Sequence, residues 1–214
     1  MQGKTWLTAF AMLILVVLAY NKLPVQAEDE VVAVLKVLEG ETPVVIDEVR
    51  RRNGRLTVST DSVGRARFEI EAELTADEAI SEARIRVWPE GKSKPELDAT
   101  VKMGRGGLRW GRTGEEPRTI AVPRNTLIYI PPSATAMEQT IRHAVRVRGK
   151  RDTVALKVWS PFMIEEVNDA EVRFRDPDTA ELSLFGATYT LTIDAEGNIL
   201  SGRVEPQGNT IIRE

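Results

Sequence analysis

The amino-acid sequence predicts a mainly β protein, in which a strongly curved antiparallel sheet or half-barrel carries one amphipathic helix packed on it. Stretches of alternating apolar and polar residues recur along the whole chain, roughly a dozen of them at close spacing, as in all-β domains. A single stretch shows the apolar period of a helix instead. No repeat of fixed period is visible, so we expect one domain rather than a repeat array.

The N-terminus has the features of an export signal. Lys4 precedes an apolar run over residues 6–19, and residues 25–27 (Val-Gln-Ala) match the small-x-small pattern of a cleavage site. The run is shorter than the roughly 20 residues that a membrane-spanning helix needs. We therefore expect residues 1–27 to be removed and residues 28–214 to form one exported domain, periplasmic or extracellular. A retained membrane anchor is the alternative, and would be the only part in contact with a membrane.

Composition narrows the classes of partner. Residues 28–214 carry a net charge of −5, because Lys4 and Lys22 belong to the predicted signal. This mild acidity gives no reason to expect nucleic acid as a partner. The chain has no cysteine, so an exported domain cannot rely on disulfides and must be stabilised by its core and its sheet.

The first half of the chain is predicted to be an antiparallel meander. The Val-rich stretch 31–38 favours a strand over a short helix, and Asn53-Gly54 is the strongest hairpin signal. In residues 65–74, apolar residues alternate with two arginines and three glutamates, which indicates a strand with one wet face. Similar patterns predict strands at 43–52, 55–62, 83–87 and 97–103 and two short strands on either side of Pro123.

Residues 133–148 are predicted to form the helix. Ser133 or Thr135 is expected to cap its first turn, and Gly149 to end it. One face is apolar and should pack on the sheet; it comprises Met137, Ile141, Ala144 and Val145. The polar residues are expected to face solvent; these are Glu138, Arg142, Arg146 and Arg148.

His143, inside this helix, is the only histidine. A catalytic base needs an orienting partner, and a metal site usually needs three or four ligands. Because no second histidine and no cysteine exists, we expect a structural or solvent-exposed role for His143, with no metal or cofactor. The sequence also lacks a G-x-S-x-G elbow, an H-E-x-x-H motif and a phosphate loop. It predicts no catalytic residues and a protein that is not an enzyme.

Alternation resumes after the helix, with strands predicted at 153–158, 170–175, 182–184, 189–193 and 199–204. The closing stretch, residues 189–213 (YTLTIDAEGNILSGRVEPQGNTIIR), resembles the end of uncharacterised secreted bacterial β-rich domains. In those domains a strand, a D-x-x-G turn, an I/L-L strand and a Q-G-x-x-I/V-x-R ending recur. Some stand alone and some precede hydrolase domains. The resemblance loosely covers most of residues 28–214. It implies a curved antiparallel sheet similar to lipoprotein-carrier half-barrels, and it transfers no catalytic residues.

Two sets of residues are candidates for ligand binding. The Gly-rich loop 102–114 is basic, so its guanidinium groups could grip a phosphate or carboxylate while its tryptophan contacts a sugar or acyl chain; its members are Lys102, Arg105, Arg109, Trp110 and Arg112. The alternative is a solvated hairpin whose charges are answered by Glu115 and Glu116. The second set would line the concave side of the sheet; it comprises Phe68, Ile70, Ile85, Trp88, Leu97, Val101, Trp159 and Phe162. The alternative is an ordinary packed core.

The leading hypothesis is an exported, non-enzymatic domain that binds a lipid or other apolar or amphipathic ligand, or an envelope component. Arginines of loop 102–114 would contact an anionic head group. The alternatives are a structural or protein-interaction module, and an accessory domain of a separately encoded hydrolase without its own active site. An open apolar cavity would favour the first hypothesis, and a filled interior the second.

Overall fold

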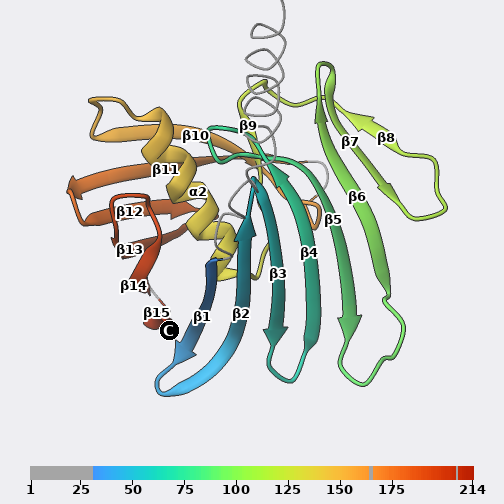
Figure 1. The fold of residues 1–214 in the computed structure, drawn as a ribbon, viewed down its shortest axis with the longest axis horizontal. Helices are drawn as coiled ribbons and strands as arrows, with labels where there is room; N and C mark the ends of the chain where they lie inside the picture. Colours follow the sequence, from blue (N-terminus) through green and yellow to red (C-terminus); the bar gives the residue numbers. More distant parts are fainter. Residues whose placement is uncertain (1–30, 164–165, 206) are drawn as a thin grey trace, which may run out of the picture.

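The computed structural model describes residues 31–163, 166–205 and 207–214 (Figure 1). The predicted signal or anchor at residues 1–27 lies outside the described residues. Within them, the chain forms a mainly β fold with a single helix, as the alternating pattern predicts.

The first half is a meander of eight strands. Asn53 and Gly54 both have positive φ, 50° and 73°, as the two central residues of a type I′ hairpin turn require, which confirms the hairpin predicted there. The strands are β1 (Val31–Glu39), β2 (Thr42–Arg52), β3 (Arg55–Ser62), β4 (Ala66–Leu74), β5 (Ile80–Pro89), β6 (Leu97–Gly104), β7 (Gly107–Arg112) and β8 (Arg118–Ile120).

The second half begins with a short strand and the helix and ends with a second meander. Its elements are β9 (Thr126–Ile128), α2 (Ala134–Val147), β10 (Thr153–Trp159), β11 (Val167–Asp176), β12 (Thr179–Leu184), β13 (Ala187–Ile193), β14 (Ile199–Glu205) and β15 (Asn209–Arg213). β15 pairs with β1, so the C-terminal end of the chain joins the two meanders into one sheet of 15 strands.

The strand order is β8-β7-β6-β5-β4-β3-β2-β1-β15-β14-β13-β12-β11-β10-β9. Neighbours are antiparallel except for β9 and β10, which are parallel. β8 and β9 are the two ends of this order, so the sheet does not close into a barrel. It curls instead, and the predicted curved antiparallel sheet with one packed helix is confirmed.

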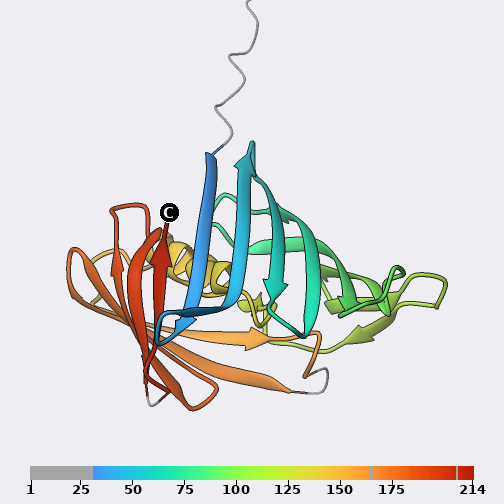
Figure 2. The ribbon, with the colours of Figure 1, turned by 90° about the horizontal axis from the view of Figure 1, so that it is seen from below.

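Figure 2 shows the resulting layers: β1–β4 lie on one side, β10 and β11 on the other, and α2 between them. The far end of β10 also reaches under the first meander, where the Trp159 ring meets the Trp110 ring edge-on at 5.9 Å between centroids. The space between the layers is filled. A pocket beside Ile70 and Ala136 has a volume of only about 10 Å³, about that of one water molecule. The structure therefore shows a packed core at the centre of the concavity.

The helix ends where the sequence predicts. Ser133 is the N-cap residue, and its Oγ accepts a hydrogen bond from the Thr135 N–H at 3.1 Å. Asp47 of β2 reinforces this cap, because its Oδ2 accepts from the Thr135 N–H at 2.8 Å and from the Ser133 hydroxyl at 2.7 Å. Gly149 has φ of +60° just past the last turn, as a left-handed C′ residue does.

The expected orientation of the polar helix face is wrong for two residues. Glu138 is fully buried and Arg142 is 9% exposed, although both were expected to face solvent. The physical reason is that the curled sheet encloses α2 from several sides, whereas a helix on an open sheet buries only one stripe. Only the last turn, with Arg146, reaches the exterior.

Candidate functional site

A buried polar cluster holds α2 inside the sheet. The Glu138 carboxylate accepts from Arg51 Nη2 at 3.0 Å, from Arg213 Nη1 at 2.5 Å and from the Ile199 N–H at 3.0 Å. Burial lowers the pKa of Arg51 from its ordinary value, although the charge of Glu138 acts in the opposite direction. Every oxygen of this carboxylate is engaged and none faces solvent. The cluster therefore fixes the helix to β2 and β15. We call Glu138, Arg51 and Arg213 the buried lock.

A second, partly buried ion pair lies nearer the surface. It joins Arg142 of α2 to Glu78 in the turn after β4. Arg142 donates two hydrogen bonds to the Glu78 carboxylate, at 3.0 and 3.2 Å, and a third to Asn198 Oδ1 at 2.6 Å. Burial alone would raise the pKa of Glu78, but the bonds and charge of Arg142 outweigh it and leave that pKa below its ordinary value. An open pocket of about 430 Å³ lies over this pair. The acidic residue in this pocket, Glu78, is kept ionised by its pairing with Arg142, and an ionised carboxylate cannot act as a proton donor.

His143 is also part of the helix's attachment. Its Nδ1 lies 2.7 Å from the Asp77 carbonyl oxygen, and the residue is buried. Among the described residues, no group of three or more His, Cys, Asp or Glu side chains is placed to hold a metal ion. In the same part of the chain, no helix has the length and apolar character needed to cross a bilayer.

The convex face of the first meander carries a network of ion pairs. Arg86 pairs with Glu69 and Glu71, and Arg84 with Asp98, at 2.5 to 3.1 Å. Trp88 lies on this face as well, with the Arg67 guanidinium 4.5 Å from its ring centroid. The prediction that Trp88 lines the concave side is therefore wrong. Trp88 pairs across the strands with Arg67, and it is adjacent in sequence to Val87, which faces inward, so it faces the opposite side.

The structure divides the basic loop 102–114 between the two faces of the sheet. Lys102 and Arg109 are paired across β6 and β7 and face the convex side, where Lys102 also contacts Glu82 at 2.5 Å. Trp110 is buried against Trp159, so its ring is not open to a sugar or an acyl chain. Arg105 lies in the turn between the strands and is exposed.

Arg112 is the member of this loop on the concave face, opposite the buried Ala99. Arg118 of β8 pairs with Trp110 and therefore lies on the same face, diagonally opposite Arg112. Both arginines are exposed, and neither forms an ion pair with another described residue. Two guanidinium groups are thus available side by side at one margin of the concave face.

An apolar row leads to this pair of arginines. Phe68, Val87 and Leu97 stand directly opposite one another on β4, β5 and β6, and all three are half-buried. Phe162 covers one end of the row, with its ring edge-on to Phe68 at 6.2 Å between centroids, and is itself 44% exposed. Leu97 is two residues from Ala99, so it is the diagonal neighbour of Arg112, at roughly 8 Å. We call these residues, with Arg112 and Arg118, the rim site.

Of the predicted ligand-binding residues, the rim site brings together Phe68, Leu97, Phe162 and Arg112. Ile70, Ile85, Val101 and Trp159 belong to the packed core. Val87 and Arg118 also belong to the rim site and were not predicted. Val87 was visible in the alternation of its strand, but the face of Arg118 depends on how β8 pairs with β7, and no local signal reports that register.

Comparison with known proteins gives a fold and no function. No protein-family model matches the sequence, and no curated protein matches it. A DUF1089 family protein from Pseudomonas aeruginosa has a similar structure, with a TM-score of 0.57 at 15% identity, over 76% of this chain and 91% of that one. A β-barrel-like protein of the domain of unknown function DUF1849 from Brucella abortus aligns with a TM-score of 0.46 at 8% identity, over 86% and 94%. The similarity to the DUF1089 family protein supports the β-rich fold and does not extend to a function.

Proposed function

We propose that this protein is an exported, non-enzymatic domain that binds an anionic amphiphile, such as a lipid with a phosphate or carboxylate group, at the rim site. The observation that carries the proposal is the continuity of the half-buried apolar row with two unpaired arginines on one face. The apolar row would receive the hydrocarbon chain, and the arginines would receive the head group.

The filled interior favours binding at the margin of the sheet over binding at its centre. A ligand at the centre would have to displace α2, whose buried lock joins Glu138 to two arginines. At the rim, in contrast, a hydrocarbon chain would cover surface that is already apolar and partly open. The row from β4 to the arginine on β7 crosses three inter-strand steps, or roughly 14 Å, which suits a chain of medium length.

The charges of Arg112 and Arg118 also favour a ligand with an anionic head group. A guanidinium without a carboxylate partner forms charge-assisted, bidentate hydrogen bonds with phosphate or carboxylate oxygens. Neutral and cationic amphiphiles would share the apolar contact and lack this interaction. We therefore expect the rim site to prefer an anionic head group over a sugar head group of similar chain length.

The test is calorimetric titration of the purified protein with dodecyl phosphate, and with dodecyl maltoside as the neutral counterpart, both below their micelle concentrations. Dodecyl phosphate should bind more tightly. Arg112→Glu should weaken it at least tenfold, because a charge-assisted hydrogen bond contributes about 1.5–3 kcal/mol. Leu97→Asp should weaken both ligands.

The matched control is Arg109→Glu, which makes the same charge change three residues away on the opposite face of β7. It should leave the affinity for dodecyl phosphate within about twofold. Equal losses for Arg109→Glu and Arg112→Glu would refute a site on the concave face. Failure of both amphiphiles to bind the wild-type protein would favour the alternative, a protein-interaction module or accessory domain, with which the packed interior also agrees.

A further inference from the structure

A second basic surface lies at one end of the first meander, apart from the rim site. Residues 102–124, which we call the wing, contain six basic and two acidic residues, a net charge of +4 in a chain whose total is −3. The wing includes β7 and β8 and projects from one side of the molecule (Figure 1). Charge is therefore strongly segregated along the sheet.

The charges are segregated within the wing too. Its two acids, Glu115 and Glu116, lie in the turn between β7 and β8. At the other end, Arg105 lies in the β6–β7 turn, and Arg109 stands two residues beyond that turn. Ile120 and Ala121 contact the same turn at Gly107, so the loop that carries Arg124 leaves from this end as well.

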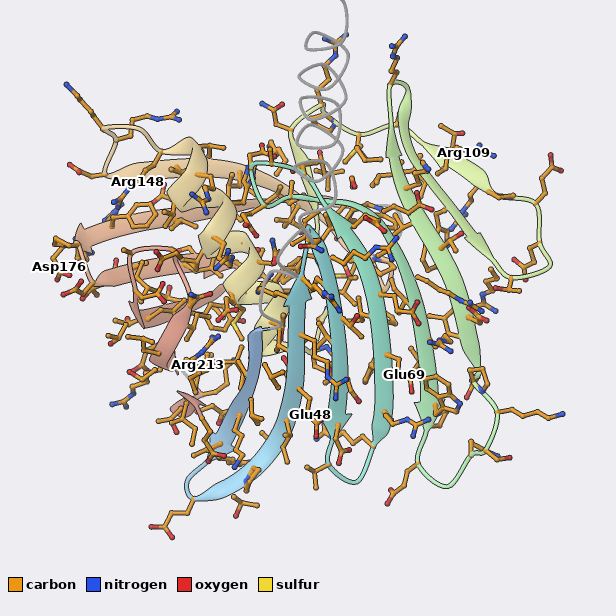
Figure 3. The ribbon with its side chains drawn as sticks, in the orientation of Figure 1. Glu48, Glu69, Arg109, Arg148, Asp176 and Arg213 are labelled. Atoms are coloured by element: carbon orange, nitrogen blue, oxygen red, sulfur yellow. The ribbon has the colours of Figure 1, made fainter. Side chains whose placement is uncertain are left out.

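These three arginines, Arg105, Arg109 and Arg124, form what we call the basic tip. All three are exposed, and none has an ion pair with a described residue. On the neighbouring convex surface, in contrast, the arginines are neutralised by glutamates and Asp98. Figure 3 shows Arg109 on the wing and Asp176 at the opposite end of the molecule. The basic tip is thus an uncompensated positive patch.

We propose that the basic tip docks on an anionic lipid surface. Its side chains come from a turn, a strand and a loop and do not converge on a pocket, an arrangement that suits an extended surface of charge better than one small anion. The proposal goes beyond the rim site, because no residue of the tip belongs to the apolar row or to its arginine pair.

The position at which the chain enters the sheet favours a membrane over other anionic partners. In an antiparallel meander, the start of β1 and the turns after β2, β4 and β6 all lie at the same end of the strands, which is one end of the sheet. The apolar run 6–19 is joined to that end of the sheet by residues 20–30, which reach about 40 Å at most. In a chain that keeps residues 1–27 as a membrane anchor, the alternative to cleavage, the anchor would tether the same end of the sheet that carries the basic tip.

Residues 28–30 are acidic and precede β1 in the sequence, and anionic lipid would repel them. The strand that they precede, β1, is six inter-strand steps from β7, roughly 29 Å along the sheet, which is several times the screening length of about 8 Å at physiological salt. Their repulsion therefore does not cancel the attraction at the tip. The expected orientation is tilted, with the wing toward the lipid.

The experiment uses the full chain, which has no cysteine, so one introduced thiol is labelled cleanly. Gly106→Cys places a fluorophore in the β6–β7 turn, where an added Cβ meets nothing within 4 Å. Pro177→Cys places it beside Asp176 at the far end. The proteins are reconstituted into vesicles of phosphatidylcholine, with or without phosphatidylglycerol, that contain a head-group quencher. Quenching of the Gly106→Cys label should require phosphatidylglycerol, and the Pro177→Cys label should stay unquenched.

Reversal of the three tip charges, by Arg105→Glu, Arg109→Glu and Arg124→Glu together, should reduce the docking equilibrium by at least about a hundredfold. Loss of each basic side chain near an anionic surface removes about a factor of five, and each introduced glutamate adds repulsion. The matched control reverses Arg173, Arg175 and Arg203 to Glu on the other meander. It changes the net charge equally and should leave quenching intact. The tip variant should still bind dodecyl phosphate, which separates this proposal from the rim site.

Three outcomes would overturn the proposal: no quenching at Gly106→Cys with phosphatidylglycerol, equal quenching in pure phosphatidylcholine, or equal loss in the control triple. Quenching that persists at about 1 M salt, where the screening length is about 3 Å, would also count against an electrostatic contact.

Discussion

Replacement of Glu138 tests whether the buried lock holds α2 inside the sheet. Glu138→Ala leaves Arg51 and Arg213 without their shared partner in surroundings where their side chains are only 12% and 18% exposed. The Ile199 N–H loses its acceptor as well. Because uncompensated buried charge is the costly outcome, we expect strong destabilisation.

The magnitude follows from that geometry. Removal of one partner from a buried ion pair typically costs about 3–5 kcal/mol, whereas the free energy of unfolding of a whole domain is about 5–15 kcal/mol. Glu138→Ala should therefore remove about a fifth or more of the stability. Glu138→Gln keeps the shape and an acceptor oxygen but loses the charge, so its effect should be intermediate, at about 1.5–3 kcal/mol.

The assay is urea unfolding followed by circular dichroism, compared at constant m value. Glu171→Ala is the matched control, because its ion pair with Arg173 is exposed and should contribute less than about 1 kcal/mol. If Glu138→Gln and Glu138→Ala both cost no more than this control, the lock does not anchor the helix. Should the Ala variant fail to fold, the Gln variant still decides the question.

Three further outcomes are expected. The hydrogen bonds and charge of Arg142 outweigh burial and set the pKa of Glu78 below its ordinary 4.5. The stabilisation from this pair is therefore present above about pH 4.5 and is lost as the pH falls through the pKa of Glu78 in the folded protein. In urea unfolding measured from about pH 5 to about pH 3, Glu78→Gln should reduce this loss of stability at low pH. Gly197→Ala should destabilise by about 1–3 kcal/mol in thermal unfolding, because its φ is +86° and its new Cβ would lie 3.1 Å from Arg142 Cα, while Gly64→Ala, with φ of +69° and open space, should cost about 1 kcal/mol. Trp159→Ala should cost about 3–5 kcal/mol and Trp159→Phe clearly less, since the residue is fully buried against Trp110; equal losses for the two would contradict the packing described.

The strands could be read from the sequence because their signal is local. In β4, Ile70 and Ala72 are buried while Glu71 and Glu73 are exposed, as a period of two requires. The Asn53-Gly54 hairpin was equally visible, since few residues besides asparagine and glycine adopt its positive φ angles. Such signals need no knowledge of what lies opposite each strand.

The site could not be read in this way, because its residues are defined by pairing between distant elements. Arg109 and Arg112 belong to the same glycine-rich hairpin, yet the alternation of β7 sends them to opposite faces. The sequence around Trp110 predicts a ring open to a ligand, whereas the ring that packs against it, Trp159, comes from the other meander. Glycine-rich, charged segments carry a weak apolar alternation, so the sequence did not indicate which arginine faces inward.

The buried polar face of α2 bears on where any ligand can bind. A helix placed only to fill a core would be expected to bury apolar side chains, yet α2 buries Glu138, Gln139 and Arg142. These side chains form specific bonds to β2, to the turn after β4 and to the turn before β14, so the helix has one position and cannot slide. A helix fixed in this way occupies the centre of the curled sheet. The Phe68 row is half-buried and lies apart from the helix, so the amphiphile proposed above would bind there without displacing the lock.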